Sequence, residues 1–189
     1  IEELWEFLDA EPKPARIAVI VKIRQNLTKK IRLIVDMLRN GTNGLIRLRE
    51  RVVLPRLWDV AESVIDLLES SVRPWNVWVA PSREIQADQQ QLEFLVLDFK
   101  DAFYTLHTNK EEWPYVVVRD LWTWIVFICV AFGLTSGPLL WGRLAALVSR
   151  FAQALVLPQE LRLQVYVDDP ILIARGTKQE RNHLYTVVL

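Results

Sequence analysis

Two adjacent carboxylates, Asp168 and Asp169, separate two short apolar segments near the end of the sequence. Residues 163–167 and 171–174 are rich in Leu, Ile and Val and predict two strands. Asp168-Asp169-Pro170 then predicts the turn of a hairpin, since Asp and Pro are favoured turn residues. Burying two unpaired carboxylates would cost their hydration. The tip of this hairpin therefore faces solvent as an ordinary acidic turn, or cations neutralise it.

A third carboxylate, Asp98, follows the apolar segment 94–97. This segment predicts another strand that ends in an acid, so Asp98, Asp168 and Asp169 are expected to converge at one edge of a sheet. Carboxylate oxygens are the ligands that Mg²⁺ prefers. Two Mg²⁺ ions about 4 Å apart can activate an attacking hydroxyl and stabilise the leaving oxygen in phosphoryl transfer. The pattern indicates a site for two Mg²⁺ ions, with Mn²⁺ as a substitute.

The rest of the chain mixes short strands and helices without regular alternation, which predicts an α+β fold. Alternating apolar residues indicate strands, and apolar residues at helical spacing indicate helices. The dipeptides Asn40-Gly41 and Asn43-Gly44 are turn signals. Ser136 is expected to cap the longest helix, with Pro138 in its first turn. The expected strands cover 15–24, 30–36, 115–118 and 122–132, the expected helices 55–69 and 136–155, a turn 25–26, and a loop or insertion 70–91.

The net charge of zero hides a basic block. Residues 13–56 contain twelve Lys or Arg against only Asp36 and Glu50. Such a block suits contacts with nucleic-acid phosphates, although a charge run is often simply a solvated face. The single cysteine, Cys129, excludes an internal disulfide and a cysteine-rich metal site.

The apolar run 121–134 is shorter than the roughly 20 residues that span a bilayer, and its composition favours buried strands. A membrane protein using residues 115–148 is the less favoured alternative. The first residues show no signal peptide. We therefore expect an intracellular protein of the cytoplasm, the nucleus or a virus-like particle, and not a secreted or membrane protein.

Three segments in order resemble motifs A, B and C of reverse transcriptases. They are Leu-Val-Leu-Asp-Phe-Lys-Asp-Ala-Phe at 95–103, Phe-Gly-Leu-Thr-Ser-Gly-Pro at 132–138 and Tyr-Val-Asp-Asp at 166–169. The chain is similar in overall character to the polyproteins of retrotransposons with long terminal repeats. The resemblance implies one domain fragment, 1–189, of the right-hand polymerase fold, with an antiparallel palm sheet, packed helices and no thumb. Fingers would cover 15–54 and 107–134, and palm 55–106 and 135–189.

The resemblance also implies roles for individual residues. Asp98 and Asp168 would be the principal metal ligands, with Asp169 as the third acid and the carbonyl of Phe99 completing the coordination. The nucleotide would meet Arg32, the main-chain N–H groups of Asp101 and Ala102, the steric gate Phe103, and Ser136. Primer and template would meet Tyr166, Gly137, Arg143, Lys29 and Lys30. Simpler interpretations are a core position for Phe103, a solvated hairpin for Lys29 and Lys30, and plain surface exposure for Arg143 and Arg150.

Two features depart from the family pattern. Motif B has Thr135-Ser136-Gly137 where Pro-Gln-Gly is usual, and Arg39 is displaced by one residue from the usual second Arg. The implied activity is RNA-directed DNA synthesis from deoxynucleoside triphosphates on a primed RNA or DNA template. The implied partners in a polyprotein are a thumb, an RNase H and an integrase. The alternative is a truncated or inactive relic that keeps the palm fold and at most binds nucleic acid.

Overall fold

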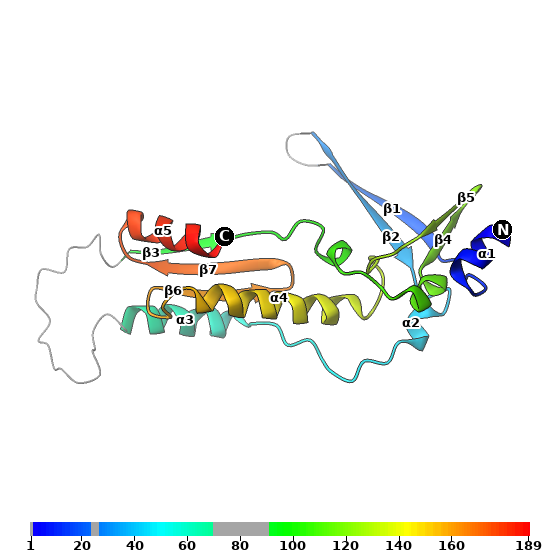
Figure 1. The fold of residues 1–189 in the computed structure, drawn as a ribbon. Coiled ribbons are helices and arrows are strands. Elements are labelled where there is room, and N and C mark those ends of the chain that lie inside the picture. The colour runs from blue at the N-terminus through cyan, green and yellow to red at the C-terminus, as the bar shows by residue number, and fades with distance from the viewer. Residues whose placement is uncertain (1, 24–26, 70–90) are drawn as a thin grey trace, which may run out of the picture. The chain divides into compact units, whose positions relative to one another are not determined.

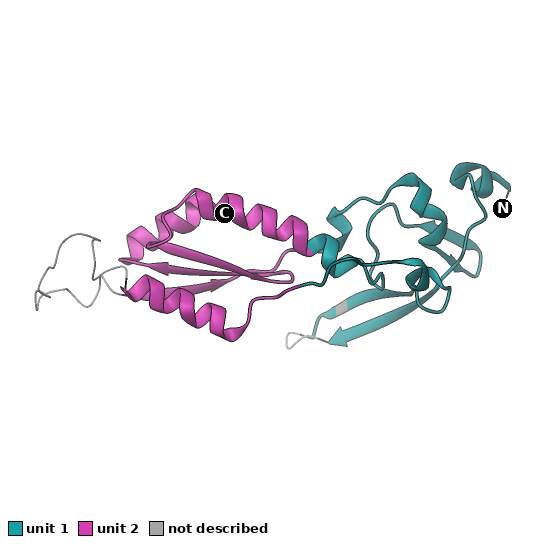
Figure 2. Ribbon diagram, turned by 90° about the horizontal axis from the view of Figure 1, so that it is seen from below, with its two compact units in different colours: residues 1–52, 101–141 teal, residues 53–100, 142–189 magenta. Residues whose placement is uncertain are grey.

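The computed structural model describes residues 2–23, 27–69 and 91–189. The expected turn at 25–26 and nearly all of the loop expected at 70–91 lie outside these ranges. Helices are mixed with antiparallel sheets, so the expected α+β class is confirmed. The chain forms two compact units, residues 1–52 with 101–141 and residues 53–100 with 142–189 (Figure 2). Their assignment as fingers and palm stays a prediction.

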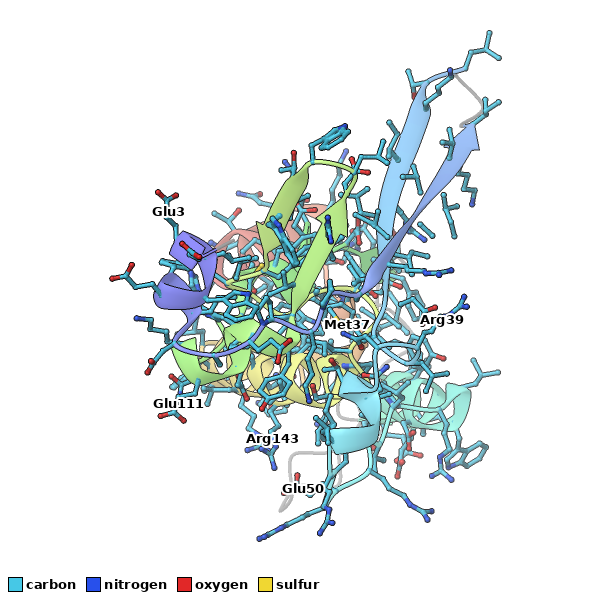
Figure 3. All side chains as sticks on the ribbon, turned by 90° about the vertical axis from the view of Figure 1, so that its right-hand side faces the viewer. Glu3, Met37, Arg39, Glu50, Glu111 and Arg143 are labelled. Atoms are coloured by element: carbon cyan, nitrogen blue, oxygen red, sulfur yellow. The ribbon has the colours of Figure 1, made fainter. Side chains whose placement is uncertain are left out.

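Unit 1 contains two antiparallel strand pairs and several short helices. Its core gathers Val35, Met37, Val118 and Val130, and Ala15 bridges to Val118 in parallel. Figure 3 shows Met37 among the interior side chains and Arg39 on the outside of the unit. The elements are α1 (Glu2–Leu8), β1 (Arg16–Ile23), β2 (Lys29–Asp36), α2 (Thr42–Leu45), the 3₁₀ helices η2 (Ala102–Thr105) and η3 (Lys110–Tyr115), β4 (Val117–Asp120) and β5 (Thr123–Val126).

Unit 2 is built on a three-stranded antiparallel sheet in the order β3-β7-β6. Helices α5 and α3 lie on opposite sides of this sheet (Figure 1). Helix α4 begins in unit 1, and its residues 142–154 belong to unit 2. The elements are α3 (Leu57–Glu69), β3 (Leu92–Val96), α4 (Gly137–Ala154), β6 (Leu161–Tyr166), β7 (Asp169–Arg175) and α5 (Lys178–Val188).

Alternation along the strands gives the two faces of this sheet different chemistry. Leu161, Leu172 and Ala174 form a buried cluster with Leu184 of α5. On the other face, Arg162 pairs with Asp66 of α3 at 3.0 Å, and the Gln164 side chain donates to Ser63 Oγ at 3.1 Å. The first face is thus held by apolar burial and the second partly by polar contacts.

The free edge of β6 is covered by one side chain. Gln153 of α4 donates from Nε2 to the carbonyl of Leu161 at 2.9 Å, and its Oε1 accepts from the N–H of Leu163 at 3.0 Å. The side-chain amide therefore replaces the peptide of a further strand. It satisfies edge groups that would otherwise invite pairing with another chain.

The strand expected at 122–132 is wrong beyond Val126, where β5 ends. Phe127 still bonds to Val116, but the carbonyl of Ile128 then accepts from Thr108, and the N–H of Val130 donates to Leu106. The run therefore changes partners midway instead of continuing one ladder. Its apolar composition does not follow from burial alone, since Val130 and Ala131 are buried but Ile125 and Ile128 are exposed. The strand expected at 115–118 is wrong at its start, since Tyr115 ends η3 and β4 begins at Val117.

Three α-helices of the described residues have no counterpart among the expected helices, namely α1, α2 and α5. Helices α1 and α2 are short, with seven and four residues. Helix α5 carried a usable signal, since Thr177 and Glu180 form a capping box at its start. None of the helices in the described part of the chain combines the length and apolar character that crossing a bilayer requires.

Candidate active site

The acidic hairpin turns one residue earlier than its composition suggests. Tyr166 pairs with Asp169, so Val167 and Asp168 form a two-residue loop while Asp169 and Pro170 belong to β7. The expected tip Asp168-Asp169-Pro170 and the assignment of Val167 to a strand are therefore wrong. Apolar pairing decides this register: Leu161 and Leu163 lie opposite Ala174 and Leu172. A shift of one residue would turn the apolar side chains to the wrong face.

Val167 holds an unusual backbone conformation in this loop. Its φ is 58°, although a positive φ at the first loop residue of a tight hairpin favours glycine. For a β-branched residue such a conformation costs on the order of 1–3 kcal/mol. The turn beside the two carboxylates is therefore held under strain by the strands around it.

Asp98 lies directly opposite Asp169. The N–H of Leu97 donates to the carbonyl of Pro170, and the N–H of Phe99 donates to that of Asp168, both at 2.9 Å. These bonds extend the register of β3 with β7, in which Val96 pairs with Ile171. Asp98 and Asp169 therefore form the pair between two hydrogen-bonded pairs, where cross-strand side chains approach most closely.

Tyr166, Asp169 and Asp98 form a row across β6, β7 and the end of β3. Each is the cross-strand partner of the next, so their side chains leave the same face of the sheet. The Tyr166 side chain is 48 % exposed, and Asp98 is exposed as well. Asp168 is half-buried in the turn beside this row.

The carboxylates supply oxygen donors of the type that Mg²⁺ takes. Across the described ranges, which include all three acids, no group of three or more His, Cys, Asp or Glu residues is arranged so that it could hold a metal ion. The donor chemistry thus fits Mg²⁺, and the main chain brings two of the acids opposite each other. The three side chains are not gathered around a common point.

The nucleotide-binding candidates lie in unit 1. Arg32 and Lys29 are exposed on β2, where Lys30 lies opposite Lys22. Phe103 packs against the core of unit 1, with its ring edge-on to Phe132 at a centroid distance of 5.2 Å. This contact supports the simpler interpretation of Phe103 as a core residue and leaves the steric-gate role as a prediction.

The other unit 1 candidates flank two helix starts. Asp101 has a φ of 55° at the start of η2, and its carbonyl accepts from Tyr104 at 2.9 Å, while Ala102 is buried. The carbonyl of Ser136 accepts from Leu140 at 3.0 Å, which places Ser136 at the position expected for the cap of α4. Gly137 is buried, and Arg143 and Arg150 are exposed on α4 in unit 2.

Sequence reasoning missed one residue of this region, Asn43. The dipeptide Asn43-Gly44 predicts a turn, whereas in the structure the Asn43 side chain donates to the carbonyl of Gly133 and accepts from the N–H of Thr135. An Asn-Gly dipeptide looks the same in the sequence whether it only forms a turn or also bonds to a distant segment. Only the tertiary contacts distinguish these two cases.

Comparison with protein-family models finds no match, and neither does comparison with curated proteins. Among solved structures, the chain is similar to a foamy virus protease–reverse transcriptase in complex with double-stranded DNA, with a TM-score of 0.57 and 15 % identity. The match covers 93 % of this chain and 24 % of that chain. A prototype foamy virus protease–reverse transcriptase mutant matches with a TM-score of 0.49 and 13 % identity, over 92 % of this chain and 19 % of that chain. The chain has a reverse-transcriptase-like fold and spans about a quarter of the length of the first of these proteins.

Proposed function

We propose that this chain is the fingers-and-palm part of an RNA-directed DNA polymerase, carried in the polyprotein of a retroelement. It would add deoxynucleotides to a primer 3′-hydroxyl on an RNA or DNA template. The observation that carries the proposal is Asp98 opposite Asp169 beside a strained hairpin turn. Strain and opposed like charges both reduce stability, and such costs persist at functional sites.

Asp98, Asp168 and Asp169 would hold two Mg²⁺ ions together with the carbonyl of Phe99. When bound, such ions would lower the pKa of the attacking hydroxyl and stabilise the charge on the leaving oxygen. The residues of the chain would orient the reactants. Tyr166 is exposed on the same face as Asp98 and Asp169, where it can contact the primer end.

The substrate contacts would come from unit 1. Arg32 and Lys29 are exposed on a hairpin within the basic block 13–56 and can meet the triphosphate and the template. Ser136 and Gly137 would contact nucleotide and template at the start of α4. The DNA complex of the foamy virus protein supports a nucleic-acid partner for this fold.

A primer-extension assay tests the proposal. We expect extension by the wild-type chain with Mg²⁺, and its loss in Asp98→Asn and Asp169→Asn. Glu111→Gln removes a similar charge from an exposed site on η3 in unit 1 and should retain activity. Extension that survives the loss of Asp98 would refute the catalytic assignment.

A relic that keeps the fold and at most binds nucleic acid is the second candidate. It is favoured by the finding that no group of three acids in the described residues is arranged around a metal position. Calorimetric titration with Mn²⁺ separates the two candidates without relying on activity. If the chain is a polymerase, Asp98→Asn and Asp169→Asn should each lower its affinity for Mn²⁺. If it is a relic, the wild type and both variants should give the same titration.

A further inference from the structure

Within unit 1, the segment that leads into α4 is fastened to β2 by main-chain contacts. The N–H of Val35 donates to the carbonyl of Phe132 at 3.1 Å. Gly133 follows with a φ of 117°, and a Cβ at this position would lie 2.0 Å from the carbonyl oxygen of Val35. Any residue other than glycine at position 133 would therefore clash with the backbone of Val35, so this position requires glycine.

The side chain of Asn43 completes this junction. Its Nδ2 donates to the carbonyl of Gly133 at 2.8 Å, and its Oδ1 accepts from the N–H of Thr135 at 3.0 Å. The Thr135 hydroxyl contacts the same Oδ1 at 3.4 Å. One amide thus holds two main-chain groups of the segment that continues directly into Ser136 and Gly137.

Asn43 is itself anchored to the core. Its own N–H donates to the carbonyl of Met37 at 2.9 Å, and the Met37 side chain is fully buried. Met37 directly follows β2, the strand that carries Arg32. The side-chain amide and the main chain of Asn43 therefore link the segment of Ser136 to the end of the strand of Arg32 through hydrogen bonds inside one unit.

We propose that Asn43 is a positioning residue for nucleotide binding. It fixes the segment 133–137 against β2, so that Ser136 and Arg32 keep the spacing that the incoming deoxynucleoside triphosphate needs. This role rests on the proposed polymerase function. Asn43 need not touch the substrate, because it acts through Thr135 and Ser136.

The chain provides a matched control in Asn40. Its Nδ2 donates to the carbonyl of Lys13 at 3.0 Å, and its Oδ1 accepts from the N–H of Thr42 at 3.1 Å. Asn40, like Asn43, thus donates to one main-chain carbonyl and accepts from one main-chain N–H, without a counterpart of the Thr135 hydroxyl contact. Its contacts fasten the segment near Lys13, which carries none of the candidate site residues.

Steady-state primer extension with the full chain tests the proposal. Asn43→Ala should raise KM for the deoxynucleotide about tenfold, as the loss of a net hydrogen bond or two predicts, and change kcat less than about twofold. Asn43→Asp keeps the acceptor for Thr135, and water can replace the donor at the exposed Gly133. Its KM should fall between wild type and Asn43→Ala. Asn40→Ala should lower the melting temperature about as much as Asn43→Ala does, but it should leave KM for the deoxynucleotide unchanged.

An equal rise of KM in Asn40→Ala and Asn43→Ala would overturn the proposal, as would an unchanged KM in Asn43→Ala. If Asn43→Ala does not fold, the KM of Asn43→Asp is compared with that of Asn40→Ala instead, and it should be the higher of the two. If the wild type extends no primer, the polymerase function fails by itself. The positioning contact is then tested by amide hydrogen exchange: the Thr135 N–H should exchange about tenfold faster in Asn43→Ala than in Asn40→Ala, and equal rates would refute it.

Discussion

Replacing Asp98 with Asn should stabilise the chain in the absence of divalent cations while abolishing synthesis. Asp98 lies directly opposite Asp169, a pair for which the Cβ atoms are about 5 Å apart in antiparallel sheets. Two like charges at about 5 Å in water repel by roughly 0.8 kcal/mol. Asn has the same shape as Asp, so Asp98→Asn should remove this repulsion and leave the strand pairing unchanged.

Thermal unfolding in EDTA measures this gain. For a chain of this length about 1 kcal/mol moves the melting temperature by roughly 2–4 °C, so a gain of about 0.8 kcal/mol should make Asp98→Asn melt about 2–3 °C higher than wild type. Added Mg²⁺ should then raise the melting temperature of wild type, because an ion that binds the folded state stabilises it. Asp98→Asn should respond much less, and Glu111→Gln should respond as wild type does. A variant that melts lower than wild type in EDTA would refute the argument from opposed charges.

Three further changes probe the framework around the site. Gln153→Ala should lower the free energy of unfolding by about 1–3 kcal/mol in urea denaturation, because it removes both hydrogen bonds to the β6 edge. Gln153→Glu keeps the acceptor for the N–H of Leu163, so its free energy of unfolding should fall by about half as much. Val167→Gly should raise the melting temperature by relieving the positive φ, a gain of about 1 kcal/mol after the flexibility of glycine is counted, and a lower melting temperature would contradict the strain. Hydrogen bonds from the main chain and the side chain of Thr177 hold the pKa of Glu180 below its ordinary value. The ionised carboxylate therefore stabilises the folded state fully above the pKa that Glu180 has in the unfolded chain, and this stability is lost as pH falls through its pKa in the folded chain. Glu180→Gln should therefore show a shallower loss of melting temperature on acidification, and an unchanged acid profile would contradict this contribution.

The acidic hairpin shows what local chemistry can and cannot predict. Its two strands and its acids follow from the sequence, because apolar runs flank the carboxylates. The position of the turn does not, since Asp and Pro favour a tip at 168–170 while the pairing of Leu163 with Leu172 requires one at 167–168. Pro170 has no N–H to donate to the ladder, but its carbonyl accepts from Leu97, so one bond between β7 and the end of β3 remains at this position. Packing on the sheet face outweighs the turn preference.

This shift changes which of the two adjacent acids lies opposite Asp98, while the ligand roles of all three acids stay a prediction. The family resemblance implies Asp98 and Asp168 as the principal ligands, whereas the strand register puts Asp169 opposite Asp98 and leaves Asp168 in the loop. Sequence order cannot separate these cases, because two adjacent acids are equivalent until the register is known.

The unit 1 candidates were harder to predict than the row on the unit 2 sheet, for a physical reason. Tyr166, Asp169 and Asp98 are arranged by strand pairing, which has a period of two residues that the sequence displays. The segment of Ser136 is instead held by single contacts from Asn43 and Gly133. Such contacts repeat at no interval and leave only an Asn-Gly dipeptide and one glycine in the sequence. A polymerase that binds its nucleotide with such a segment would depend on residues that no periodic pattern reveals, so Asn43 should influence KM even though it lies outside all three motifs.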